Sequence, residues 1–219
     1  MTTVLLASSS PRRTELLRRA GLPHTVVAPA EDVIPPRSLS ADDAVGLIAR
    51  AKAEDVVGQA PAGSFVIGAD TMVVGPGGPL GKPHTAQRAR RMLAELRGRR
   101  HVVLTGVCVL TPGGIEASGV SRSQVTMRNF SDREIDAYVD GGEPLDRAGA
   151  YAVQGGGGEL IEVVQGRLDT VVGLDVAMTF DLLSRCGYGE RLARPDDLTI
   201  PLRGTGQMVR SGERPGTPI

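Results

Sequence analysis

The sequence predicts an α/β fold, because apolar runs of the kind that form buried strands alternate with amphipathic helices. Val4–Ala7 is such a run, and the polar turn after it leads to Pro11, which suits the first position of a helix. Phe65–Ala69 predicts a second buried strand. Between these two strands, apolar residues recur at helical spacing from Ala44 to Ala51. Strand, helix, strand in this order indicates the α/β class.

Caps, breakers and periodicity predict the remaining elements. We expect a helix from Pro11 to Gly21, a strand at 24–28, a helix capped by Ser40, a strand from Phe65 to Val74 that turns at 75–78, a helix from Thr85 to Gly98, a hairpin of His101–Thr111 with Ile115–Met127, a helix opened by the capping box Ser131–Glu134, a strand at Leu160–Val164, and a last helix from Asp169 to near Gly187. The four glycines at 155–158 are either a flexible turn or backbone that approaches a ligand closely.

The chain divides into a domain of residues 1–189 and a C-terminal extension of residues 190–219. The extension is rich in Pro, Gly and Arg and lacks hydrophobic periodicity. We therefore expect it to be loosely packed or disordered.

Composition excludes several classes of protein. The 219 residues carry 25 basic and 25 acidic side chains, so no charge excess favours nucleic acid or an anionic membrane as a partner. Aromatic residues make up 3%, which is too few for base-stacking platforms. We find neither a membrane-spanning apolar run nor a signal peptide and expect a cytoplasmic protein. Cys108 and Cys186 fit buried apolar positions, with no zinc-binding spacing.

Only Lys52 and Lys82 are lysines, so 23 of the 25 basic residues are arginine. Lysine is a compact point charge, whereas arginine is a rigid planar fork, and the two are not interchangeable. A site that needs an ammonium group would retain lysine against such a bias. The alternative is that both lysines remain by chance.

A set of charged residues predicts a polyphosphate site. Arg12 and Arg13 stand in the first turn of a helix, where free N–H groups attract anions, although they could simply be a solvated pair. Asp70 ends a buried strand, a common place for chemistry in α/β sheets, although it could also be a turn-forming residue. With Lys52, Lys82 and the acidic Glu31, they suit a polyphosphate that shares its charge with Mg²⁺. The reaction would be hydrolysis, with Asp70 activating water.

Motifs for other reactions are missing. The chain has no GxxxxGK[ST] pattern for a P-loop and no GxGxxG that opens a helix after the first strand. It also has no GxSxG nucleophile elbow. The sequence therefore does not support a P-loop enzyme, a dinucleotide-binding protein or a serine hydrolase.

The sequence resembles the Maf family of nucleoside triphosphate pyrophosphatases. The resemblance runs in family order over about residues 3 to 185, so it covers nearly all of the chain before the extension. It rests on these stretches: LLASSSPRRTELL (Leu5–Leu17), KA (Lys52-Ala53), GADTMVV (Gly68–Val74), GKP (Gly81–Pro83), HVVLTGV (His101–Val107), EIDAY (Glu134–Tyr138), RAGAYAVQG (Arg147–Gly155) and VVGLDV (Val171–Val176).

The resemblance implies a two-lobed α/β protein with an extended mixed β-sheet, flanking helices and a nucleotide cleft between the lobes. It implies cleavage of a nucleoside triphosphate to monophosphate and pyrophosphate, with Mg²⁺ or Mn²⁺ as cofactor, and it suggests a homodimer. By position, Asp70 matches the residue that activates water, and Glu31 with Asp70 would hold the metal. The residues that match those around the triphosphate are Ser8, Arg12, Arg13, Lys52 and Lys82.

Within the family, the resemblance favours the branch that acts on dTTP and UTP. The specificity positions of that branch correspond to Arg12, Thr71 and Gln154. An amide such as Gln154 both donates and accepts, which suits the O4/N3–H edge of thymine or uracil. Departures from the usual family residues at Arg147, Val153, 166–169 and Asp175 bear on base recognition and leave the phosphate-binding residues unchanged.

Two alternatives remain open at this point. The protein could be a pyrophosphatase for other or modified nucleotides, such as CTP or methylated GTP. It could instead be a nucleotide-binding regulator of cell division, connected with septum formation, in which catalysis is incidental. Replacing Asp70 by Asn separates an enzyme from a regulator, because only an enzyme depends on a carboxylate that activates water.

Overall fold

The computed structural model describes residues 3–30, 33–189, 200–201 and 208–209. The helices are α1 (Pro11–Arg19), α2 (Ala41–Val57), α3 (Ala86–Leu96), α4 (Asp132–Asp140), α5 (Leu168–Val172) and α6 (Val176–Arg185), with short 3₁₀ helices η1 (Glu143–Asp146), η2 (Ala148–Ala150) and η3 (Gly156–Leu160). The strands are β1 (Val4–Ala7), β2 (Thr25–Val27), β3 (Phe65–Gly75), β4 (Gly78–Leu80), β5 (Arg100–Leu110), β6 (Glu116–Met127), β7 (Ile161–Gln165), β8 (Ile200–Pro201) and β9 (Met208–Val209).

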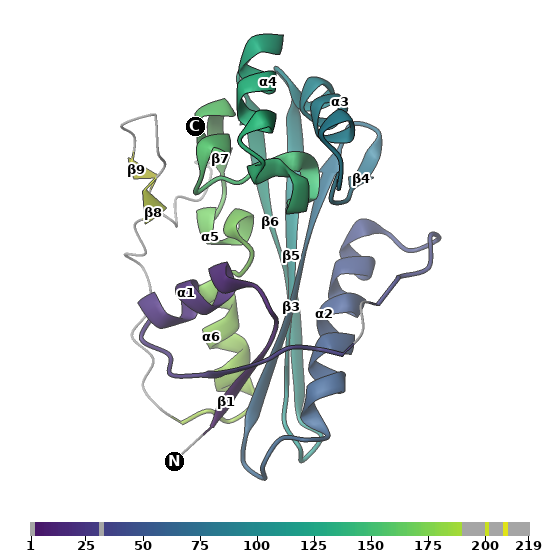
Figure 1. The fold of residues 1–219 in the computed structure, drawn as a ribbon. Coiled ribbons are helices and arrows are strands. Elements are labelled where there is room, and N and C mark those ends of the chain that lie inside the picture. The colour runs from purple at the N-terminus through teal and green to yellow at the C-terminus, as the bar shows by residue number, and fades with distance from the viewer. Residues whose placement is uncertain (1–2, 31–32, 190–199, 202–207, 210–219) are drawn as a thin grey trace, which may run out of the picture. The chain divides into compact units, whose positions relative to one another are not determined.

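Seven of these strands form one mixed sheet, which confirms the predicted α/β class (Figure 1). The order is β2-β1-β3-β5-β6-β7, and β4 pairs with β3. Strand β1 is parallel to both β2 and β3, whereas β4 is antiparallel to β3 and β7 is antiparallel to β6. The chain divides into two compact units. The first contains the described residues of Met1–Thr71, Thr105–Ser121 and Gly173–Leu198, and the second contains those of Met72–Leu104, Arg122–Val172 and Thr199–Ile219.

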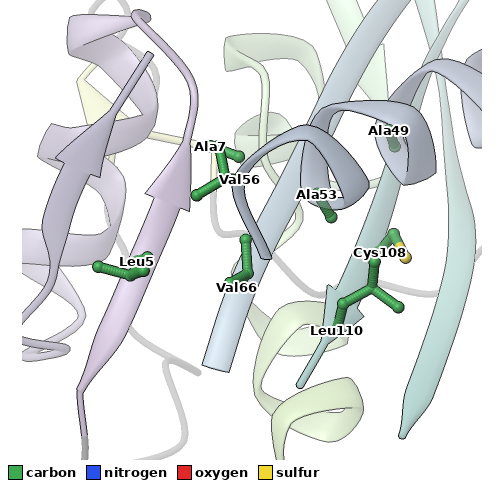
Figure 2. Close-up of a cluster of buried hydrophobic side chains, with 8 residues drawn as sticks. All are labelled: Leu5, Ala7, Ala49, Ala53, Val56, Val66, Cys108 and Leu110. Carbon is green, nitrogen blue, oxygen red and sulfur yellow. The ribbon is translucent and has the colours of Figure 1, made fainter. Parts of the chain in front are cut away.

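The core of the first unit lies where α2 packs on the sheet. Buried side chains come from β1, α2, β3 and β5, and Figure 2 shows them together: Leu5, Ala7, Ala49, Ala53, Val56, Val66, Cys108 and Leu110. Alanines on the sheet-facing side of α2 let the helix backbone come close to the strands. Both cysteines are buried and unbridged, as expected, and burial raises the pKa of the Cys108 thiol to about 12.

Most of the predicted helix ends and turns are confirmed. The Ser40 and Thr85 side chains accept hydrogen bonds from backbone N–H groups at the starts of α2 and α3, and the capping box of Ser131 with Glu134 opens α4. Three features were not predicted: the short strand β4 and the 3₁₀ helices η1 and η2. Residues 155–158 lead into a third 3₁₀ helix, η3.

The prediction of one last helix from Asp169 to Gly187 is wrong. Helix α5 ends at Val172 and α6 begins at Val176. Gly173 interrupts the helix because its φ of +132° lies outside the helical region. Asp175 then caps α6 by accepting a hydrogen bond from the Met178 N–H at 2.9 Å.

The predicted extension of residues 190–219 lies outside the described residues except for β8 and β9. These two short strands pair antiparallel, with Ile200 opposite Val209 and Pro201 opposite Met208. The expectation of loose packing for the rest of the extension stays a prediction.

Candidate active site

A lysine and an aspartate, which the sequence placed on different elements, meet in the first unit. Asp70 lies within β3 and not at the end of a strand, as was predicted, because β3 continues to Gly75. Lys52 on α2 donates a hydrogen bond from Nζ to Oδ1 of Asp70 at 2.7 Å. Their side chains are only 14% and 19% exposed. Because the pair is largely shielded from solvent, its charges interact more strongly than those of a surface ion pair.

Two glycines allow this meeting by letting α2 lie directly on the strands. A Cβ on Gly68 of β3 would lie 2.1 Å from the Ala49 carbonyl oxygen and 2.7 Å from the Ala53 nitrogen. A Cβ on Gly106 of β5 would lie 2.6 Å from the Val45 carbonyl oxygen. Both contacts are with helix backbone, which cannot move aside as a side chain can. Gly68 therefore sets the short separation from which Lys52 reaches Asp70.

Arg13 lies at the centre of a second cluster in the same unit. Its guanidinium is buried and donates three hydrogen bonds to neutral oxygens. Nε binds the Gly173 carbonyl at 2.8 Å, Nη1 binds Ser8 Oγ at 2.9 Å, and Nη2 binds Thr71 Oγ1 at 3.2 Å. One side chain thus ties together the end of β1, the middle of β3 and the break between α5 and α6.

Hydroxyl groups complete this cluster. Thr71 Oγ1 donates to the Gly173 carbonyl at 3.3 Å. It also lies 3.0 Å from Oγ1 of Thr105, a fully buried residue of β5. Since the single Thr71 proton is used on Gly173, Thr105 donates to Thr71.

Among the residues that the structure describes, the positive charge of Arg13 forms no ion pair with a carboxylate. Burial lowers the pKa of the Arg13 guanidinium, and the negative charge of Asp70 opposes that shift. Arginine nevertheless stays protonated in proteins, so this end of β1 and β3 carries a fixed buried cation. The positive charge of Arg13 attracts the negative charge of Asp70, and it would attract a bound anion in the same way.

The start of α1 has the other features expected of an anion site. Ser10 caps the helix without a side-chain hydrogen bond, and the first turn holds no acidic residue. Arg12 lies in that turn and is partly exposed. Ser8 is buried, and its Oγ also accepts the Ser10 N–H at 3.2 Å. The structure therefore brings together five predicted site residues on the first unit besides Arg12: Ser8, Arg13, Lys52, Asp70 and Thr71.

Two predicted site residues belong to the second unit. Lys82 pairs with Asp146, with 2.7 Å between Nζ and Oδ1, and the two side chains are 52% and 74% exposed. Gln154 is partly exposed and occupies a tight turn in which the Gly155 N–H binds the Ala152 carbonyl at 3.1 Å. Their roles in catalysis and base selection stay predictions.

The predicted metal ligands are Glu31 and Asp70, and Glu31 lies outside the described residues. In the part of the chain that the structure describes, no three His, Cys, Asp or Glu side chains cluster as a metal cage. Mg²⁺, however, is usually held by one or two carboxylates together with substrate phosphates rather than by a protein cage. The partly buried carboxylate of Asp70 fits that manner of binding.

Sequence reasoning missed three residues that build this site: Gly68, Thr105 and Gly173. All three stand inside the stretches that carried the family resemblance. For Gly68 and Gly173, the available signal was the unusual position of a glycine within a buried strand and within a helical pattern. Such a glycine often marks a close approach of the backbone or a break in the helix. Their partners could not be read from the sequence, because each lies far away along the chain.

These features describe an α/β protein with a shielded lysine–aspartate ion pair near a buried arginine. A family model described as "Maf-like protein" matches residues 3–186 of this sequence. The chain therefore belongs to the Maf-like protein family, which confirms the resemblance found in the sequence.

Several relatives carry the name "dTTP/UTP pyrophosphatase". One from Anaeromyxobacter dehalogenans (strain 2CP-C) is 46% identical over 196 residues, which covers 84% of this chain and 94% of the relative. One from Myxococcus xanthus (strain DK1622) is 45% identical over 186 residues, with 85% of this chain and 93% of the relative covered. One from Moorella thermoacetica is 44% identical over 188 residues, with 85% and 96% covered.

Among solved structures, a nucleoside-triphosphatase described as a dITP/XTP pyrophosphatase from Mycobacterium abscessus matches with a TM-score of 0.37 and 18% identity. That match covers 59% of this chain and 74% of the other. In the described part of this chain, no helix has the length and apolar character needed to cross a membrane.

Proposed function

We propose that this protein hydrolyses a nucleoside triphosphate, dTTP or UTP, to the monophosphate and pyrophosphate. The observation that carries the proposal is the shielded pair of Lys52 and Asp70, whose Nζ and Oδ1 lie 2.7 Å apart beside a buried arginine. Family membership and the names of the relatives supply the reaction and the substrate class.

In the proposed reaction, a water molecule attacks the α-phosphorus. The Asp70 carboxylate accepts a proton from that water, a bond forms between the water oxygen and the α-phosphorus, and the bond from that phosphorus to the α,β-bridging oxygen breaks. Pyrophosphate leaves with the bridging oxygen. Lys52 provides positive charge next to the base, where negative charge develops on the phosphoryl oxygens. Arg13 supports the site by holding Ser8 and Thr71 in place.

We further propose that a divalent cation, Mg²⁺ or Mn²⁺, takes part in the reaction. Asp70 would hold it together with phosphate oxygens of the substrate, and the cation would neutralise phosphate charge and polarise the phosphoryl group. A chelator should therefore abolish turnover of the purified protein, and added Mg²⁺ or Mn²⁺ should restore it. Full activity after exhaustive chelation would overturn metal dependence.

For the choice of base, we propose that Gln154 recognises the pyrimidine. Its amide can donate to O4 and accept from N3–H, the two groups that thymine and uracil share. Cytosine presents an amino group and an unprotonated ring nitrogen at the same positions, so it would meet the amide with the opposite pattern.

The decisive experiment measures pyrophosphate release from dTTP, UTP, CTP, GTP and methylated GTP, for the wild type and for Asp70→Asn. We expect release from dTTP and UTP and a loss of about 10²–10⁴-fold in the variant, the usual range for a general base. Release from the other nucleotides alone would overturn the pyrimidine assignment. Nucleotide binding without release from any substrate would instead favour the regulatory role.

Oxygen labelling tests the point of attack. In water enriched in heavy oxygen, attack at the α-phosphorus places the label in the monophosphate. Attack at the β-phosphorus would place it in pyrophosphate and overturn the proposed reaction, even if the products were the same.

A further inference from the structure

The segment that carries Gln154 is held on both of its sides by two side chains from an earlier part of the second unit. The segment runs from Ala152 to Gly157 and contains the turn closed by the Gly155 N–H and the Ala152 carbonyl. Tyr138 at the end of α4 and Glu143 at the start of η1 contact it from outside.

Tyr138 fixes the N-terminal side of the segment. Its hydroxyl oxygen accepts the Ala152 N–H at 3.0 Å. A Cβ on Gly157 would lie 2.7 Å from the same hydroxyl oxygen and 2.7 Å from the Ala152 nitrogen. The segment therefore closes around the tip of Tyr138, and Gly157 can do so only because it has no side chain.

Glu143 fixes the C-terminal side. Its Oε2 accepts the Gly157 N–H at 3.4 Å, and burial together with the nearby Glu143 carboxylate raises the pKa of the Tyr138 phenol. A Cβ on Gly155 would fall 1.6 Å from Glu143 Oε1, so the carboxylate lies directly against the backbone next to Gln154. Tyr138 and Glu143 thus form one connected unit that contacts Ala152, Gly155 and Gly157.

These contacts have to hold the segment because packing on one side is incomplete. Tyr138, Glu143, Gly155 and Gly156 line a cavity of about 540 Å³. Four consecutive glycines have little intrinsic stiffness, so they would not keep one conformation beside such a cavity without bonds to fixed side chains. The glycine run therefore serves close contact with the protein's own side chains.

We propose that Tyr138 and Glu143 are specificity-determining positioning residues, which act on base selection through Gln154. The inference rests on the proposed function, since it assigns these residues to pyrimidine recognition. By holding Ala152 and Gly157, they fix the backbone that carries Gln154 and thereby the place at which its amide meets the base. Neither residue takes part in the chemical step at phosphorus.

The test is a double-mutant cycle of Tyr138→Phe with Gln154→Ala, read out as the ratio of kcat/KM for dTTP to that for dCTP. Tyr138→Phe keeps the ring and removes the acceptor for the Ala152 N–H. We expect the ratio to fall about fivefold, the cost of one hydrogen bond, mainly through a higher KM for dTTP. In the Gln154→Ala background, the same change should alter the ratio less than twofold, because the residue through which it acts is gone.

Glu143→Gln is a second variant, in which the ratio of kcat/KM for dTTP to that for dCTP should also fall. The amide keeps the size of the side chain but loses the negative charge, which weakens the hydrogen bond that the side chain accepts from the Gly157 N–H. Matched controls are Tyr151→Phe, which removes a buried hydroxyl bound to His101 at 2.7 Å, and Glu162→Gln on the exposed side of β7. Both controls should leave the ratio unchanged.

The outcomes separate this inference from the proposed function. If the wild type releases no pyrophosphate from dTTP, the proposed function fails, and with it the basis of this inference. If the wild type is active but Tyr138→Phe and Glu143→Gln keep the wild-type ratio, only the positioning role is overturned. It is overturned equally if Tyr138→Phe lowers the ratio as much without Gln154 as with it, or if Tyr151→Phe has the same effect.

Discussion

Lys52 and Asp70 lie eighteen residues apart in the chain, yet their charged atoms are 2.7 Å from each other. Gly68, two residues before Asp70 on the same strand, lets α2 approach β3 closely enough for this contact. The site therefore depends on a residue that has no side chain and takes no part in the chemistry.

Gly68→Ala should damage both the fold and the site. The new methyl carbon would meet the Ala49 carbonyl oxygen at 2.1 Å and force α2 away from β3. We expect a loss of about 1–3 kcal/mol in the free energy of unfolding, as for other overpacked cores, and reduced turnover because Lys52 moves with the helix. Urea unfolding and pyrophosphate release measure the two effects. Gly58→Ala at the end of the same helix is the control, since a Cβ there meets nothing within 4 Å; an equal loss in both variants would contradict the argument.

Lys52→Arg tests whether lysine at this position is a requirement or a leftover in an arginine-rich chain. The planar guanidinium is larger than the ammonium group and cannot occupy the same shielded place against Asp70 without displacing it. We expect kcat/KM for dTTP to fall about tenfold or more, with little change in secondary structure by circular dichroism. The reverse exchange on the same helix, Arg50→Lys, serves as control, because Arg50 forms exposed ion pairs with Glu54 and Glu116. Wild-type activity of Lys52→Arg would support the leftover interpretation.

Arg13→Lys should destabilise the first unit. A lysine cannot reproduce a fork that bonds Ser8, Thr71 and the Gly173 carbonyl at once. We expect about 2–4 kcal/mol lower stability, in the range for broken buried charge networks, measured by denaturant unfolding. Arg12→Lys in the same helical turn is partly exposed and should cost less than about 1 kcal/mol while raising KM. Equal stability losses in the two variants would argue against a central role for Arg13.

The buried residue His101 should make the stability of the protein depend on pH. It is buried in the second unit, where Nε2 lies 2.7 Å from the Tyr151 hydroxyl, and burial lowers the pKa of His101 from 6.5 to about 4. The unfolded chain therefore binds a proton at higher pH than the folded one, so this residue makes stability fall as the pH drops from about 6.5 to about 4. The full loss is about 3 kcal/mol.

His101→Gln removes this titration while keeping a polar side chain. The variant should be less stable than the wild type at pH 7, but its stability should fall less between pH 7 and pH 4.5. Urea unfolding at both pH values gives the comparison. His84→Gln, at an exposed position, should keep the wild-type pH dependence. Parallel pH profiles of His101→Gln and the wild type would show that His101 is not the group responsible.

Local structure could be read from the sequence because its causes lie within a few residues. Pro11 at the start of α1, the Ser40 and Thr85 caps, and the box of Ser131 and Glu134 all act over one helical turn. The same reasoning failed at Gly173. There the apolar pattern continues through the break, and the reason for the break, a carbonyl that binds Arg13, lies 160 residues away.

The α/β class, the family and the types of residue available for phosphate chemistry follow from short-range periodicity and from motifs, so they could be read from the chain alone. Which of those residues meet depends on the three-dimensional fold. It paired Lys52 with Asp70, turned Arg13 inward to Ser8, Thr71 and Gly173, and placed Lys82 against Asp146. The physical reason is that sheet order and close glycine contacts bring together side chains from distant parts of the chain, and no local pattern records which distant partner each one will have.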